Sequence, residues 1–185
     1  DVRELDYADW MKHISIVFQD TNLFKMSVAE NVAMYKPGAS RKEIMEALRQ
    51  ARCEDILEKL PDGVDSVIGA RGVYLSGGEM QRIALARAIL KDAPIVLLDE
   101  ATAFADAENE YLIQRALDIL LRGKTVLMIA HRLQTIVHAD QIIVMQRGGI
   151  AEQGTHEELM QRQGVYAKMY HEYENSVSWK IGGLA

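Results

Sequence analysis

Short apolar runs alternate along the chain with longer segments in which apolar residues recur every three or four positions. Three of the runs are rich in β-branched residues, which predicts strands at 14–18, 95–98 and 125–130. The segment 108–121 lies between the second and third strands, and its apolar spacing predicts a helix. Strands that alternate with helices are typical of a parallel sheet covered by helices. The pattern therefore predicts an α/β fold.

A different pattern fills 27–91, which is predicted to be mainly helical. A serine followed three residues later by a glutamate forms a capping box, a common helix start, at Ser27 and again at Ser40. A third capping box at Ser76 precedes an amphipathic helix that we expect to end near Lys91. These signals favour a helical subdomain inserted between two parts of the sheet core.

After the third strand, the chain is expected to form a small β-hairpin and a last helix. The segments 141–146 and 150–153 are apolar and are joined by a glycine-containing turn, which predicts the hairpin. Thr155 and Glu158 then cap a helical stretch that we expect to reach Glu174. The predicted boundaries divide the chain into 1–26, 27–92, 93–174 and a flexible tail at 175–185.

Composition and charge exclude several classes of protein. The 185 residues carry a net charge of −6, whereas a broad nucleic-acid footprint needs clustered lysine and arginine. The longest apolar runs fall well short of the roughly 18 residues that cross a bilayer. The chain opens on a polar stretch rather than an apolar leader, and its single Cys53 cannot form an internal disulfide. Because the negative net charge argues against a broad nucleic-acid footprint, any phosphate that the chain binds must be held by a local site.

Polar residues follow the predicted strands, at the edge where open parallel sheets bind ligands. Asp99 and Glu100 end the second strand, and because successive strand residues alternate in direction, one carboxylate can face a metal ion while the other faces a water molecule. His131 follows the third strand, and Gln19 follows the first. A polar turn, a structural histidine and a surface amide are the ordinary alternatives. Convergence on one sheet edge is what favours a site.

The capping box formed by Ser76 and Glu79 encloses Gly77 and Gly78 at the first helical positions. Capping alone does not require glycines, because glycine is less favourable than alanine inside a helix by up to about 1 kcal/mol. Two glycines leave the backbone N–H groups and the positive end of the helix dipole open to an anion. The alternative is a capped helix without a ligand. A phosphate site is the interpretation that explains the glycines.

Five motifs follow one another along the chain: VFQD at 17–20, LSGGE at 75–79, IVLLDE at 95–100, AFAD at 103–106 and IAHR at 129–132. Their order and spacing resemble the nucleotide-binding domain of ABC transporters, from residue 1 to about residue 172. In that family, the five positions are the Q-loop, the signature motif, Walker B, the D-loop and the switch histidine. Five motifs in the right order are far more specific than any one of them.

The resemblance implies a P-loop NTPase-like parallel-sheet core with a helical subdomain, and ATP and Mg²⁺ as cofactors. It implies that Asp99 holds Mg²⁺ through water, that Gln19 ligates the ion, and that Glu100 acts as the general base. His131 would contact the γ-phosphate. The further nucleotide contacts implied by the family are Ser76, Gly77, Gly78, Glu79 and Asp106.

The resemblance also implies partners. ATP in this family lies between two nucleotide-binding domains arranged head to tail, so residues 76–78 would serve the nucleotide held by the partner. A transmembrane domain, fused upstream in the full protein, would place the domain on the cytoplasmic face of the cell membrane, where ATP hydrolysis powers export. No nucleic acid is implied. Because Glu100 and His131 are both present, two active sites per dimer are expected.

A P-loop, which has the pattern G-x-x-x-x-G-K-[ST] between a strand and a helix, is missing from the sequence. The only candidate is Gly123, Lys124 and Thr125, but Asp118 stands where the first glycine should be, and a helix precedes the run while a strand follows it. We interpret Gly123 as a helix C-cap with Lys124 beside the exposed carbonyls. The family places the P-loop upstream of the Q-loop. The chain is therefore expected to be truncated at its amino end and, alone, to bind ATP poorly and hydrolyse none.

Three segments depart from the usual family pattern, among them the D-loop, which reads Ala-Phe-Ala-Asp where Ser-Ala-Leu-Asp is usual. Glu79 replaces a common glutamine, although either residue can close the capping box. Ala103 replaces the serine of the D-loop, and Ala70 replaces an acidic residue in a loop that resembles the one through which exporters contact transmembrane helices. Two other readings remain open at this point, a non-transport ABC ATPase acting on chromosomes or ribosomes and a non-catalytic interaction fragment.

Overall fold

The computed structural model describes residues 2–18, 21–69, 73–99, 107–130 and 133–182. The chain divides into two compact units, Asp1–Ile129 and Ala130–Ala185, which we describe separately. Both of the internal boundaries expected from the sequence near residues 26 and 92 fall inside the first unit, and the division into four segments stays a prediction.

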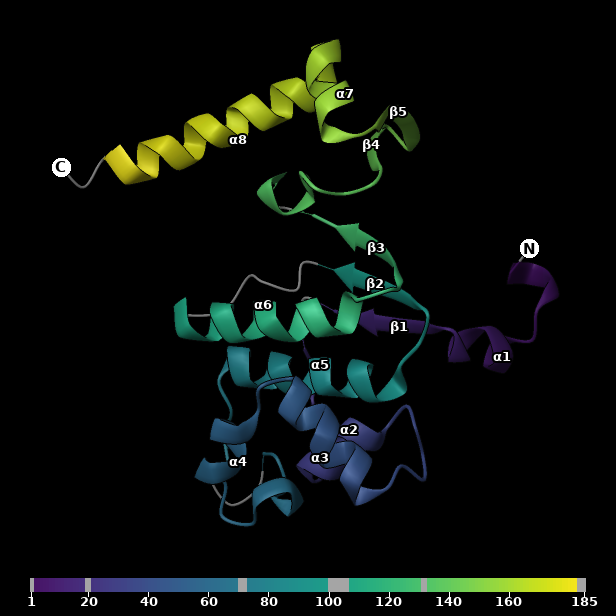
Figure 1. The fold of residues 1–185 in the computed structure, drawn as a ribbon, viewed down its shortest axis with the longest axis vertical. Helices are drawn as coiled ribbons and strands as arrows, with labels where there is room; N and C mark the ends of the chain where they lie inside the picture. Colours follow the sequence, from purple (N-terminus) through teal and green to yellow (C-terminus); the bar gives the residue numbers. More distant parts are fainter. Residues whose placement is uncertain (1, 19–20, 70–72, 100–106, 131–132, 183–185) are drawn as a thin grey trace. The chain divides into compact units, whose positions relative to one another are not determined.

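Three parallel strands form the sheet of the first unit, in the order β1 (Ile14–Val17), β2 (Ile95–Asp99) and β3 (Thr125–Ile129) (Figure 1). Ile14 pairs with Ile95, and Ile95 pairs with Thr125, so the strands start together. Their carboxyl ends consequently meet at one edge, where Asp99 is the last residue of β2 and lies opposite Ile129. The parallel α/β arrangement predicted from the sequence is confirmed.

Two long helices lie side by side next to this sheet, α5 (Gly77–Lys91) and α6 (Ala107–Leu121) (Figure 1). Both run opposite to the strands, so they begin at the end of the unit where the strands finish. At the other end of α6, Gly123 adopts a φ of 70° and terminates the helix as predicted. The Lys124 backbone N–H donates to the Leu121 carbonyl at the end of α6 at 3.2 Å, and its ammonium lies 2.9 Å from the Asp92 carboxylate.

A helical subdomain packs against α5 and contains α2 (Val28–Ala33), α3 (Arg41–Gln50), α4 (Glu54–Lys59) and a 3-10 turn at Gly63–Asp65. The capping boxes predicted at Ser27 and Ser40 are present, each with its glutamate reaching back to the serine N–H. These two helices therefore begin where the sequence indicated. Helix α4 was not separately predicted.

Helix α5 differs from the amphipathic helix that we expected. Most of its apolar residues are buried, but so are the polar side chains of Gln81, Arg82 and Arg87. The physical reason is that α2 and α3 cover one side of α5 while α6 and β1 cover the other. Buried charged groups need partners. Arg82 donates to the Asp55 carboxylate at 2.6 and 2.9 Å, and Arg87 donates to the Asn31 carbonyl at 2.8 Å.

The residues before β1 form a 3-10 turn (Val2–Glu4) and helix α1 (Tyr7–Lys12), which the sequence pattern did not predict. The Asp6 carboxylate caps α1 by accepting hydrogen bonds from the backbone N–H groups of Ala8 and Asp9, at 2.9 and 3.3 Å. Since α1 has no buried residue of its own, this cap is a main local determinant of where it begins.

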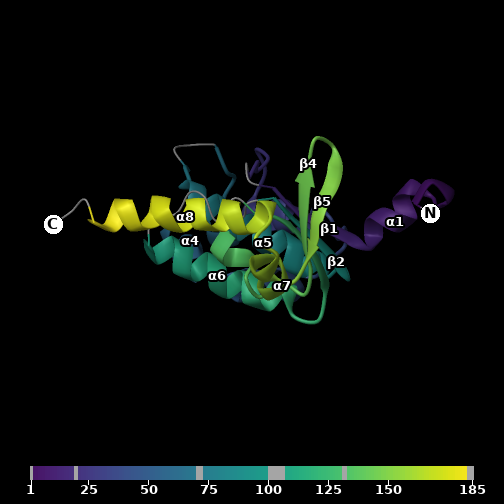
Figure 2. The same ribbon diagram turned by 90° about the horizontal axis from the view of Figure 1, so that it is seen from above.

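The second unit contains a 3-10 turn (Leu133–Ile136), a hairpin of β4 (Ile142–Gln146) and β5 (Gly149–Gly154), and the helices α7 (His156–Arg162) and α8 (Val165–Gly182) (Figure 2). The antiparallel hairpin confirms the prediction. Its turn residues Arg147 and Gly148 both have positive φ, 51° and 79°, as tight hairpin turns require. Ile142, Val144 and Leu159 are buried together in the small core of this unit.

The final helical stretch differs from the prediction in two ways. It is broken after Gln163, because the Glu152 carboxylate accepts hydrogen bonds from the backbone N–H groups of Val165 and Tyr166 and starts a new helix there. Helix α8 also continues past Glu174 to Gly182, through most of the segment predicted as a flexible tail.

Among the described residues, we find no helix that is both long enough and apolar enough to cross a membrane.

Candidate functional site

The first turn of α5, residues 76–79, is called the glycine turn below. Ser76 is the N-cap, and its hydroxyl accepts a hydrogen bond from the Glu79 backbone N–H at 3.2 Å. The Glu79 carboxylate in turn accepts from the Ser76 backbone N–H at 2.8 Å. The N–H groups of Gly77 and Gly78 have no hydrogen-bond partner among the described residues. The helix start thus keeps two donors for an outside acceptor.

The capping box does not itself require glycine, since the same box starts α2, α3 and α7. The first two positions of those helices hold Val28 and Ala29, Arg41 and Lys42, and His156 and Glu157. Four helices therefore share one capping arrangement, and only α5 begins without side chains at both positions. The two glycines of α5 need a separate cause.

Gly78 is explained by packing. It is buried, and a Cβ atom at this position would lie 2.8 Å from Cγ and 2.9 Å from Cβ of Asn109 on α6. A glycine here lets the two helices start close together, a contact that sequence reasoning missed because the residues are far apart in the chain. Gly77 is exposed instead. Within the turn, Ser76 and Gly77 are therefore the residues that are exposed to solvent.

Charged residues of α4 reach the glycine turn. The Lys59 ammonium lies 3.2 Å from Oε1 of Glu79 and 3.8 Å from the Asp55 carboxylate. Burial alone would raise the pKa of Glu79, but the Ser76 N–H, the Lys59 ammonium and the Ser76 hydroxyl together lower it. Glu79 is therefore a carboxylate at neutral pH, and one of its two oxygens faces Lys59.

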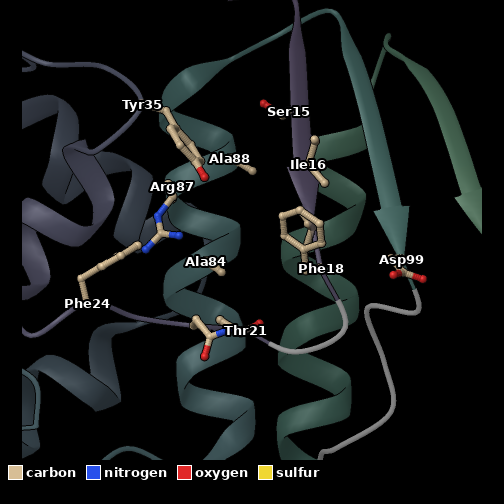
Figure 3. A pocket seen from close by; sticks show the side chains of 12 residues that line it. Ser15, Ile16, Phe18, Thr21, Phe24, Tyr35, Ala84, Arg87, Ala88 and Asp99 are labelled. Carbon is tan, nitrogen blue, oxygen red and sulfur yellow. The ribbon is translucent and has the colours of Figure 1, made fainter. Parts of the chain in front are cut away.

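A cavity of about 430 Å³ lies beside the carboxyl ends of β1 and β2 (Figure 3). Asp99 lines it from the end of β2, while Phe18 and Thr21 line it from the segment after β1. On the α5 side, the Arg87 guanidinium lies 5.6 Å from the centre of the Tyr35 ring. Of the described residues that line this cavity, none belongs to the glycine turn. The glycine turn thus lies outside the lining of the cavity that Asp99 borders.

Comparison with known families assigns the chain. The sequence model of the family described as ABC transporter matches residues 1–103, which is more than half of the chain. The chain belongs to the ABC transporter family. It is a nucleotide-binding domain of the exporter type, and its fold is that of an ABC ATPase.

Individual relatives agree with this assignment. The ATP-dependent lipid A-core flippase of Legionella pneumophila (strain Paris) is 49% identical over 169 residues, which cover 91% of this chain and 29% of the flippase. The mycobactin import ATP-binding/permease protein IrtA of Mycolicibacterium thermoresistibile is 51% identical over 170 residues, covering 92% of this chain and 19% of that protein. The structure of a bacterial Atm1-family ABC exporter with ATP bound is 41% identical, with a TM-score of 0.79 over 89% of this chain and 29% of the exporter. The chain therefore spans less than a third of each relative.

The ABC motifs divide into those that the structure describes and those that it does not. The described site residues are Asp99 and the four residues of the glycine turn, Ser76, Gly77, Gly78 and Glu79. The remaining predicted residues, Gln19, Glu100, Asp106 and His131, lie outside the described residues, and their roles stay predictions. The structure brings Ser76, Gly77, Gly78 and Glu79 together in the first turn of α5, where Ser76 and Gly77 are exposed, and places Asp99 at the edge of the sheet.

Asp99 suits a magnesium ion in its chemistry. Mg²⁺ keeps several water molecules in proteins and uses one or two carboxylates, so a dense cluster of acidic residues is not required. Among the described residues, no group of three or more acidic, cysteine or histidine side chains gathers in one place. Asp99 offers a single carboxylate beside a cavity that has room for water and phosphate. It fits the role of one of those carboxylates.

Proposed function

We propose that this chain is the ATP-binding and ATP-hydrolysing part of a transporter that moves a substrate across a membrane. The observation that carries the proposal is the glycine turn, in which the N–H groups of Gly77 and Gly78 have no hydrogen-bond partner among the described residues and Gly77 is exposed at the positive end of α5. Such a helix start attracts phosphate through hydrogen bonds and through the helix dipole. The family assignment supports a nucleotide as the source of that phosphate.

The nucleotide would lie between two copies of the domain. The glycine turn is not among the described residues that line the cavity beside Asp99, which leaves it available to a nucleotide held by another copy. In a head-to-tail dimer, the glycine turn of one copy would bind the phosphates held beside Asp99 of the other. The complete protein would also contain a transmembrane domain, as the ATP-binding/permease name of one relative supports, and would sit with this domain on the cytoplasmic face.

Catalysis would depend on positioning and on charge. Mg²⁺ would be held by Asp99 through water and by Gln19, and when bound it would supply positive charge against the phosphates. Glu100 would take the proton of the attacking water, and His131 would donate a hydrogen bond to the γ-phosphate. Asp106 would complete the contacts around the nucleotide.

The chain alone would not perform this reaction. Its 185 residues contain no P-loop, whose N–H groups and lysine hold the β- and γ-phosphates. We therefore expect the isolated chain to bind Mg-ATP weakly and to hydrolyse none, while the complete protein does both. Calorimetric titration and phosphate release, measured on both proteins, test this. Submicromolar binding with turnover by the isolated chain would contradict it.

The glycine turn is tested by placing a negative charge on it. In the complete protein, Gly77→Asp should raise the KM for ATP strongly, because the new carboxylate would face the triphosphate. Lys42→Asp is the matched control, since it lies in the first turn of α3 behind the same capping box and is exposed. Both changes add an acidic residue to a helix start, which favours the fold. Equal ATPase kinetics in the two variants would contradict the proposal.

Glu100 is tested by removing its ability to accept a proton. In the complete protein, Glu100→Gln should stop hydrolysis while ATP binding continues, so ATP-bound dimers should accumulate. Retained nucleotide and apparent mass on a sizing column report this directly. Unchanged turnover in the variant would remove Glu100 from the role of general base.

A further inference from the structure

A chain of charges connects the buried part of the helical subdomain with the glycine turn. Arg82, whose side chain is 1% exposed, binds the Asp55 carboxylate through both terminal nitrogens, at 2.6 and 2.9 Å. Asp55 lies 3.8 Å from the Lys59 ammonium, and Lys59 lies 3.2 Å from Oε1 of Glu79. Glu79 lies in the first turn of α5, and Arg82 follows it on the same helix. The four side chains therefore form a row of alternating charges that starts at Arg82, passes through Asp55 and Lys59, and ends at Glu79.

Glu79 creates an electrostatic conflict at this turn. A carboxylate in the first turn stabilises the helix by interacting with its positive end. The same negative charge opposes any second anion at that end, and the opposition is strong where water is partly excluded. The side chain of Glu79 is only 15% exposed, so solvent screens it incompletely. A phosphate site built around Gly77 therefore needs a positive group to offset Glu79.

Among the described residues, Lys59 carries a positive charge close enough to Glu79 to offset its negative charge. Arg82 is already matched by Asp55, whereas Lys59 faces both Asp55 and Glu79 and remains 67% exposed. An ammonium on a long, exposed side chain contributes little to folding stability, because solvent screens the pair and ordering the chain costs entropy. Its effect on the local potential at the helix start persists at moderate ionic strength.

We propose that Lys59 is a positioning residue that neutralises Glu79, so that the glycine turn can accept the phosphate of a nucleotide although its last residue is a carboxylate. The inference rests on the proposed function, because it assumes that a phosphate binds at this turn. It predicts that Lys59 matters only while residue 79 is negative. A glutamine at this position would close the capping box without a charge, and Lys59 would then be dispensable.

The test is a double-mutant cycle in the complete protein, with ATPase kinetics measured for Lys59→Met, Glu79→Gln and the combined variant. Lys59→Met should raise the KM for ATP about threefold to tenfold, the range for one partly screened charge acting over several Å, and leave kcat nearly unchanged. In the Glu79→Gln background, the same substitution should change KM by less than about twofold, because no carboxylate is left to neutralise. Lys59→Arg should keep the starting KM, since it retains the charge.

Salt dependence separates an electrostatic role from a structural one. The KM difference between Lys59→Met and the starting protein should shrink as ionic strength rises. An equal rise in KM whether Glu79 is kept or replaced by glutamine, or no rise in either case, would overturn the inference while the proposed function stands. A complete protein that hydrolyses no ATP even without substitutions would instead overturn the proposed function, and the inference with it.

Discussion

Gly78 and Asn109 share one small space between α5 and α6, where a Cβ on the glycine would lie 2.8 Å from the asparagine Cγ. The start of α5 carries the signature residues, and α6 begins just after the D-loop. The close approach therefore holds the first turns of α5 and α6 together. Gly78 allows the two helices to pack closely, while Gly77 leaves the first position of α5 without a side chain.

Gly78→Ala should destabilise the domain because its methyl group overlaps the inner atoms of Asn109. Overpacking of this kind costs about 1–3 kcal/mol, partly offset by the better helix propensity of alanine. Thermal unfolding of the complete nucleotide-binding domain measures the effect, and the midpoint should fall by several degrees.

Two matched variants sharpen that measurement. Gly77→Ala, at the exposed position of the same turn, should leave the midpoint unchanged or raise it slightly. Adding Asn109→Gly to Gly78→Ala should recover part of the loss, since it vacates the space that the new methyl group enters. An unaltered midpoint in Gly78→Ala would show that the helices can separate without cost.

The ion pair of Arg82 and Asp55 should make the domain sensitive to acid. Hydrogen bonds from Arg82 lower the pKa of Asp55 from its ordinary 3.8. A carboxyl group whose pKa is lowered in the folded state stabilises the fold above its ordinary pKa, and this contribution is lost as the pH falls through the lowered value. Asp55→Asn should therefore be less stable than the starting domain at neutral pH, by about 2 kcal/mol, less than the ~3–5 kcal/mol typical of a fully buried pair.

The stability difference between Asp55→Asn and the starting domain should begin to shrink as the pH falls below 3.8, and it should disappear below the lowered pKa of Asp55. Unfolding midpoints measured across the acid range test this, with Asp62→Asn as the control, because Asp62 is an exposed aspartate in the following loop. Midpoint curves for Asp55→Asn and the starting domain that stay parallel down to the most acidic condition would exclude the ion pair as the cause.

Cys53 should be chemically inert in the folded domain. Its side chain is fully buried at the start of α4, and burial raises its pKa to about 12. The thiolate that reacts with alkylating agents is therefore scarce and shielded at pH 8. Iodoacetamide followed by peptide mass spectrometry should leave Cys53 unmodified until urea unfolds the domain. A cysteine introduced at Glu58, exposed on the same helix, should react at once; rapid labelling of Cys53 itself would contradict its burial.

Features that depend on neighbouring residues could be predicted from the sequence. The capping boxes at Ser27, Ser40, Ser76 and Thr155 all form, because the serine or threonine and the glutamate that close each box are three residues apart. The parallel strands were predictable for a similar reason, since each apolar run is short and bounded by polar residues. Asp99 followed from its place at a strand end.

Features set by distant contacts could not be predicted. The sequence predicted an amphipathic α5, but its Arg82 and Arg87 are buried, and only the fold brings Asp55 and Asn31 to them. The break before α8 depends on the Glu152 carboxylate, which arrives from the hairpin. Two contacts at the glycine turn also come from other helices. Asn109 packs against Gly78, and Lys59 lies beside Glu79.

A mixed dimer shows whether the glycine turn of one copy binds the nucleotide held beside Asp99 of another. Two differently tagged copies of the complete protein, one with Asp99→Asn and one with Gly77→Asp, are co-expressed, and ATP turnover is measured in the purified mixed dimer. Each variant alone should be nearly inactive. The mixed dimer should regain turnover, because one of its sites combines an intact Asp99 with an intact glycine turn from the other copy. A mixed dimer as inactive as its parents would mean that the turn does not act across the dimer, and would contradict the account.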